Sequence, residues 1–185
     1  MSHDCTRAII DLDAVSSNFD AVCRKAKVPV MAVIKADAYG HGAVQVARTL
    51  QELGADYLAV SSIDEAMELR HNGIAMPILI LGHTPREQVK NLIDLHITQA
   101  VTCAAKAEEY SAEAVKCGGT LKVHIKVDTG MSRLGFLAYG EDLNRSLDEI
   151  GEIAKMPNLS ITGTFTHFAV ADEDDRNRFA FTKLQ

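Results

Sequence analysis

Short runs of apolar residues recur along the chain, and most of them are continuous rather than alternating with polar residues. Continuous runs of this length are typical of parallel strands that are covered on both faces. The runs begin about 20 to 40 residues apart, and they span residues 28–34, 57–60, 78–81, 97–101, 121–127 and 160–166. We therefore predict a parallel sheet in which each strand is followed by a helix.

Helical patterns fill the intervals between these runs. Val46, Leu50 and Leu53 fall on one helical face, and such a stripe needs a sheet to cover it. The same period predicts a second apolar stripe, formed by Leu143, Leu147, Ile150 and Ala154. Near the start of the chain, residues 8–15 (AIIDLDAV) look strand-like and precede a helical stretch at 17–26.

Helix boundaries are also marked. Ser62 and Thr84 are each followed three positions later by a glutamate, Glu65 and Glu87, which is the sequence form of a capping box. Expected helix ends are marked by glycines, at Gly54, Gly73 and Gly118. The order of elements is therefore strand and helix in regular alternation.

Repeated strand–helix units lead either to an open doubly wound sheet or to a (β/α)8 barrel. We count six units in 185 residues, whereas a closed barrel needs eight and about 250 residues. We predict an α/β fold of the TIM-barrel type, truncated after about six βα units, with residues 1–185 forming one partial barrel domain.

Composition narrows the class of protein. The hydrophobic share of 47% and charged share of 24% are those of a globular chain. A net charge of -6, with acidic and basic residues mixed throughout, gives no sign of the basic surface that binds a nucleic-acid backbone. No run is long enough for a membrane helix, and no leader-like segment opens the chain. The four cysteines and seven histidines lack metal-ligand spacing, so we expect a cytoplasmic protein without a metal, a membrane or a nucleic-acid partner.

The segment 33–42 (VIKADAYGHG) is the first candidate for chemistry, because a buried strand ends in Lys35 before a turn of small residues. Ligands bind at the carboxyl ends of parallel strands. A desolvated lysine at that position can supply a neutral amine for a Schiff base. Taken by itself, a lysine at a strand end is more commonly a surface lysine whose charged end reaches the solvent.

The segment 122–136 (KVHIKVDTGMSRLGF) is the second candidate. Apolar residues alternate there with Lys122, His124 and Lys126, so one strand face is polar. A lysine pointing into a barrel must be paired or modified, because an isolated buried ammonium is costly. Arg133 follows in a glycine-containing loop, where a carboxylate partner would equally account for it.

The third candidate is His167, in the segment 163–169 (GTFTHFA) that ends the sixth predicted strand. A histidine beside aromatic residues can lie against a planar ring, and it can also be an ordinary packed side chain. The sequence pattern leaves both open.

These three segments together resemble the alanine racemase family, whose cofactor-lysine signature is matched by residues 32–40 (AVIKADAYG) without insertions or deletions. The resemblance implies a pyridoxal 5'-phosphate (PLP) enzyme of bacterial origin. Lys35 would hold the cofactor and act as one of two bases at the substrate Cα, and Tyr39 would reach the cofactor phosphate. Arg133 would contact its phenolic oxygen and His167 would stack on its ring, while Lys126 matches a lysine that is carbamylated in some members.

The resemblance runs from residue 8 to residue 185 but covers only about half of a family member. Full-length members add the last barrel strands and a C-terminal β domain, work as homodimers, and interconvert L- and D-alanine for cell-wall precursors. Their second base is a tyrosine from the partner subunit, and no tyrosine of this chain matches it. We therefore expect these 185 residues alone to be nearly inactive, and to associate through an exposed apolar edge.

Other functions remain open at this point. The chain could belong to a racemase for another small amino acid such as serine. It could also be a non-catalytic PLP-binding protein, which its short length favours and its three motifs disfavour, or a structural domain that binds no PLP.

Overall fold

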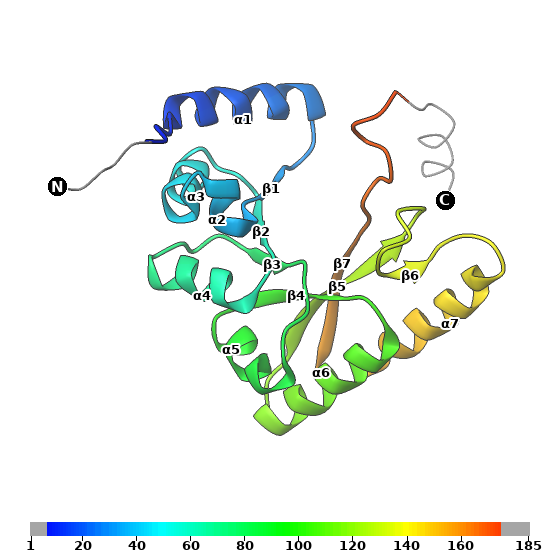
Figure 1. Ribbon diagram of the computed structural model, residues 1–185. Coiled ribbons are helices and arrows are strands. Elements are labelled where there is room, and N and C mark those ends of the chain that lie inside the picture. Colours follow the sequence, from blue (N-terminus) through cyan, green and yellow to red (C-terminus); the bar gives the residue numbers. More distant parts are fainter. Residues whose placement is uncertain (1–6, 175–185) are drawn as a thin grey trace. The chain divides into compact units, whose positions relative to one another are not determined.

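The computed structural model describes residues 7–174, and in this part of the chain strands and helices alternate (Figure 1). The chain divides into two compact units at the boundary between Ile78 and Leu79. Each of the six predicted apolar runs overlaps a strand, so the predicted alternation is confirmed. No helix within residues 7–174 is long and apolar enough to cross a membrane.

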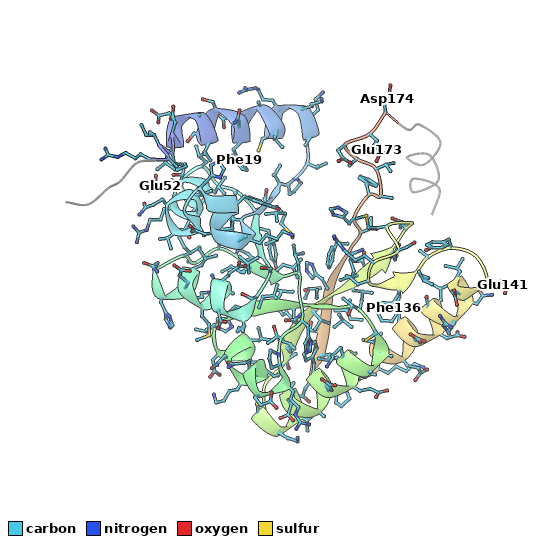
Figure 2. All side chains as sticks on the ribbon, viewed as in Figure 1. Phe19, Glu52, Phe136, Glu141, Glu173 and Asp174 are labelled. Carbon is cyan, nitrogen blue, oxygen red and sulfur yellow. The ribbon has the colours of Figure 1, made fainter. Side chains whose placement is uncertain are left out.

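The first unit is built around two parallel strands. In chain order its elements are α1 (Leu12–Ala26), β1 (Met31–Val33), α2 (Lys35–Gly40), α3 (Ala43–Glu52), β2 (Tyr57–Val60) and α4 (Ile63–His71). Strand β1 pairs with β2 in register, with Met31 opposite Tyr57. Helix α1 packs on α3, and Figure 2 shows Phe19 on the side of α1 that faces α3. The core contains Val46 and Leu50 of α3 together with the buried residues of β2.

The predicted strand at residues 8–15 is wrong. Helix α1 already begins at Leu12, and residues 7–11 before it form no regular element. Asp11 decides this, because its side chain accepts hydrogen bonds from the backbone N–H groups of Asp13 (2.9 Å) and Ala14 (3.0 Å). Such a cap satisfies donors that a helix start leaves free, and it outweighs the apolar pattern.

The second unit is a group of parallel strands centred on the longest one, β5 (Leu121–Asp128). Its elements are β3 (Ile78–Ile80, beginning at the unit boundary), η1 (Arg86–Gln88), α5 (Val89–Asp94), β4 (Ile97–Val101), α6 (Ala104–Cys117), β5 (Leu121–Asp128), β6 (Phe136–Leu137), α7 (Asp142–Ile153) and β7 (Leu159–Phe165). Strand β5 pairs in parallel with β4, with β7 and with the short β6. The two-residue strand β6 was not predicted, since it is too short to leave a pattern.

One predicted capping box is correct and one is wrong. Ser62 caps α4 and accepts a hydrogen bond from the backbone N–H of Glu65. Thr84 lies fully buried before η1 and donates instead to Gln99 Oε1 at 2.6 Å. Tyr110 joins the same buried network through Thr84, and burial raises the pKa of Tyr110 to about 12. Buried polar groups must be paired. The Thr84 hydroxyl therefore pairs with Gln99 and does not cap the helical turn that follows it.

The predicted stripe on α7 is also only partly buried. Leu143 and Leu147 are exposed, and Ser146 and Ile153 are the buried residues of this helix. Gly118, by contrast, ends α6 as predicted, with the positive φ of 66° that favours glycine.

Candidate functional site

Lys35 follows strand β1 at the position that the sequence predicts. Its side chain is half-buried, and the preceding Ile34 is buried and donates its N–H to Ala59 O of β2 at 2.8 Å. Strand pairing therefore fixes the backbone up to the residue before the lysine.

The turn after Lys35 is left-handed. Four consecutive residues, Ala36 to Tyr39, have φ between 51° and 56° and ψ between 36° and 53°. The left-handed conformation costs a non-glycine residue roughly 1–2 kcal/mol, and a run of four persists only where surrounding contacts hold it. Sequence reasoning predicted a small-residue turn here, but it had no signal for this handedness.

Several hydrogen bonds hold the turn. The N–H of Ala36 donates to Glu65 Oε1 at 2.7 Å, from a different element of the fold. The Asp37 carboxylate accepts the N–H of Ala43 at 2.6 Å and so caps α3, while Ala38 N–H donates to Ile34 O at 2.9 Å. The strained segment is thus tied at its first, second and third residues.

Tyr39 completes the turn and is 61% exposed. An exposed phenol at this position is free to reach a ligand outside the strand end. Lys35 and Tyr39 lie four residues apart in the first unit, with Tyr39 as the last residue of the left-handed turn that follows Lys35.

Lys126 lies near the carboxyl end of β5 and is only 4% exposed. Its Nζ donates to Val127 O at 2.8 Å and lies 5.7 Å from the centre of the Phe165 ring. Burial lowers the pKa of Lys126 below its ordinary value; Asp128 counteracts this, and the positive charge of Arg133 adds to it. The prediction of a polar face is confirmed for this residue, whose ammonium is buried and hydrogen-bonded.

Asp128 organises the loop that carries Arg133. The carboxylate is 1% exposed and accepts the N–H groups of Gly130 (2.8 Å), Ser132 (3.0 Å) and Arg133 (3.1 Å). Burial acts to raise the pKa of Asp128, but these hydrogen bonds and the charge of Lys126 outweigh it and hold that pKa below its usual range. The exposed Arg133 side chain therefore projects from a loop held by an ionised aspartate.

Gly135 ends this loop where two backbones meet closely. A Cβ atom there would lie 2.6 Å from Lys126 O, and φ is +113°. Only glycine meets both conditions, so the loop is pressed against the strand that carries Lys126.

His167 follows β7 and is exposed. The loops after β5 and β7 are tied by a hydrogen bond of 2.7 Å between the hydroxyls of Thr129 and Thr166. His167 lines an open depression of about 540 Å³, and Figure 2 labels Glu173, which also lines it, on the segment after β7. The remaining lining residues are Met131, Phe168, Ala169, Ala171 and Asp172.

The structure thus brings Lys126, Arg133 and His167 to the carboxyl ends of two paired strands of the second unit. Lys35 and Tyr39 occupy the equivalent position after β1 in the first unit. Two supporting carboxylates, Glu65 and Asp128, were missed. The signal for Asp128 was its place at a strand end, whereas Glu65 was interpreted only as part of a capping box.

Charged and aromatic residues at the carboxyl ends of parallel strands define a β/α-barrel type of ligand-binding domain. Residues 10–185 match the family described as "Alanine racemase, N-terminal domain". The chain belongs to this family.

Individual relatives agree with this assignment. Alanine racemase 1 of Caldanaerobacter subterraneus is 43% identical over 174 residues, covering 93% of this chain but 44% of its own length. The structure of an alanine racemase of Clostridium difficile 630 superposes with a TM-score of 0.83 at 39% identity, covering 94% of this chain and 47% of that one. A histidine racemase of Leuconostoc mesenteroides gives a TM-score of 0.84 at 30% identity, with coverages of 95% and 46%.

These comparisons confirm the α/β fold of barrel type and the family resemblance. They also establish that the chain spans only about half the length, or less, of these relatives.

Proposed function

We propose that this protein is a PLP-dependent amino-acid racemase that acts on alanine and carries its cofactor on Lys35. The main support is the segment 32–40, which matches the cofactor-lysine signature and forms a strand end followed by a strained, tightly held turn. Backbone strain of this kind is concentrated at functional sites.

The residues present fit PLP. The half-buried amine of Lys35 suits the cofactor aldehyde, and the exposed Tyr39 hydroxyl suits its phosphate. The exposed guanidinium of Arg133, on a loop held by Asp128, suits the phenolic oxygen. The planar ring of His167 suits stacking on the pyridine. The assignment of each residue rests on the family resemblance and on this chemical match.

PLP, when bound, delocalises the negative charge that develops at the substrate Cα. Lys35 then moves a proton at the Cα on one face of the substrate. Inversion also needs a base on the opposite face, since one group cannot take a proton from one face and return it to the other. We assign that second base to no tyrosine of this chain, and we propose that these 185 residues alone have little or no racemase activity.

Lys126 has two proposed states. As an ammonium it is buried and hydrogen-bonded to Val127 O. As a carbamate it would offer a carboxylate to the Arg133 side chain, and its lowered pKa favours the neutral amine that carbamylation requires. Intact-protein mass in bicarbonate buffer, with Lys126→Ala as the control, distinguishes the two.

Alanine is the proposed substrate because the relatives cited from Caldanaerobacter and Clostridium are named alanine racemases. A second candidate function is a racemase for another amino acid, such as serine. It is supported by the similarity to a histidine racemase. A panel of amino acids assayed on the longer parent protein separates these functions. We further propose a cytoplasmic homodimer that supplies D-alanine for cell-wall precursors.

The test of the cofactor site is chemical labelling. PLP is added to the purified protein, the adduct is reduced with borohydride, and the modified peptide is identified by mass. We expect label on Lys35, loss of it in Lys35→Ala, and retention in Lys122→Ala, a control at an exposed lysine of β5. Wild-type protein without label on Lys35 would contradict the proposal.

A further inference from the structure

The left-handed turn after Lys35 is held from outside by one carboxylate of helix α4. Glu65 accepts the N–H of Ala36 through Oε1 at 2.7 Å. Its other oxygen, Oε2, accepts the N–H of Ser61 at 2.7 Å and the hydroxyl of Ser61 at 2.9 Å. One side chain therefore joins the segments that follow β1 and β2.

Capping of its own helix does not account for this arrangement. In a capping box the glutamate returns to the backbone N–H of the cap residue, which here is Ser62. Glu65 also accepts the N–H of Ser61, and its other oxygen accepts the N–H of Ala36, 29 positions away in the sequence. The hydrogen bonds to Ser61 and Ala36 therefore go beyond the capping of α4, and the second of them reaches the segment that carries Lys35.

Glu65 binds these donors as a charged group. Partial burial acts to raise its pKa, but the hydrogen bonds from Ser61 and Ala36 outweigh burial and hold the pKa of Glu65 below its ordinary value. The carboxylate is therefore ionised at neutral pH, and hydrogen bonds to an ionised acceptor are stronger than those between neutral groups.

We propose that Glu65 is a positioning residue for Lys35. By fixing the Ala36 amide directly after the lysine, it sets the direction in which the Lys35 side chain leaves the strand. It acts through the backbone and touches no reacting atom. The inference deepens the proposed function and rests on it only for the role of the Lys35 amine.

The test compares Glu65→Gln with Glu68→Gln, the same substitution at an exposed position of the same helix. A glutamine has one oxygen and one NH₂ group, so it cannot accept from Ala36 and Ser61 through separate oxygens. Glu65→Asp is the second variant, since it keeps the charge but shortens the reach.

The first readout is amide hydrogen exchange of the peptide containing residues 33–40, which needs no cofactor. We expect exchange in Glu65→Gln and Glu65→Asp to be faster by roughly fivefold or more, as the loss of a charged hydrogen bond implies. Glu68→Gln should exchange like the wild type.

The second readout is competitive acetylation, in which the rate at Lys35 is measured relative to Lys122 in the same sample. We expect this ratio to change at least about twofold in both Glu65 variants, because a loosened turn changes the access of the Lys35 amine. The urea midpoint, measured in parallel, reports whether each variant remains folded.

Unchanged exchange in both Glu65 variants would overturn the proposal, and so would faster exchange with an unchanged acetylation ratio. Neither readout uses PLP. Failure of PLP to label Lys35 in the wild type therefore refutes the proposed function and leaves the test of Glu65 intact.

Discussion

At the scale of single residues, two buried or half-buried carboxylates hold the two candidate loops. Asp128 accepts three backbone N–H groups of the Arg133 loop, and Glu65 accepts those of Ala36 and Ser61. Both residues have pKa values below the ordinary range because these hydrogen bonds outweigh the effect of burial. Each loop is therefore shaped by a negative charge that is hydrogen-bonded to its backbone.

Asp128→Asn should destabilise the protein by about 1–3 kcal/mol, because the amide NH₂ group cannot accept a hydrogen bond and would face a backbone N–H that one carboxylate oxygen now accepts. Urea unfolding at neutral pH measures this loss. The matched control, Asp148→Asn on the exposed face of α7, should differ from the wild type by less than about 0.5 kcal/mol. Equal stability of both variants would show that the Asp128 hydrogen bonds contribute little.

The same residue predicts a pH dependence. Its pKa is lower in the folded than in the unfolded state, so its contribution is present above the unfolded pKa, which is near ~4. That contribution is lost as the pH falls through the lower, folded-state pKa. Urea midpoints measured from neutral pH down to about pH 3 should therefore fall less steeply in Asp128→Asn than in the wild type.

At the scale of elements, the turn labelled α2 has the opposite hand to the other helices around it. Residues Ala36 to Tyr39 are left-handed, whereas α6 is an ordinary right-handed helix that ends at Gly118. The same substitution should therefore affect stability differently in the two elements.

Ala36→Gly should leave the protein equally stable or stabilise it by up to about 1 kcal/mol, since glycine avoids the left-handed penalty but gains freedom in the unfolded chain. Ala112→Gly, at an exposed position of α6, should destabilise it by about 0.5–1 kcal/mol. Urea unfolding of the two variants tests the difference in sign. Destabilisation by both to the same extent would contradict a left-handed turn at Ala36.

At the scale of the whole molecule, apolar side chains remain exposed in the second unit. Leu147 of α7 is 58% exposed and Phe168 after β7 is 45% exposed. An exposed apolar side chain can contribute to an interface with another copy of the chain. The sequence predicts self-association through an apolar edge of the sheet, and these two side chains, which lie outside the strands, are additional candidates for such contacts.

We expect the apparent mass of the 185-residue chain to rise with concentration in sedimentation experiments. Leu147→Glu should reduce this rise without lowering the urea midpoint, because the side chain is already exposed. A monodisperse, stable monomer at all concentrations would contradict the expectation.

The sequence by itself determined the order of strands and helices, the family, and the strand ends at which Lys35, Arg133 and His167 lie. Continuous apolar runs, helix caps and motifs of eight or nine residues are local features. They can be recognised in the sequence because each depends only on residues that are close together in the chain. The sequence also indicated that Lys126 belongs to a polar strand face.

The tertiary structure alone decided the features that depend on distant partners. Thr84 bonds to Gln99 rather than to its own helix, and Glu65 reaches Ala36 across the space between two strand ends. The left-handed turn exists because such contacts offset the conformational cost of positive φ in non-glycine residues. Local residue preferences alone would favour a right-handed or extended backbone there. Local patterns therefore identify the candidate lysine, whereas its orientation depends on hydrogen bonds from residues distant in the chain.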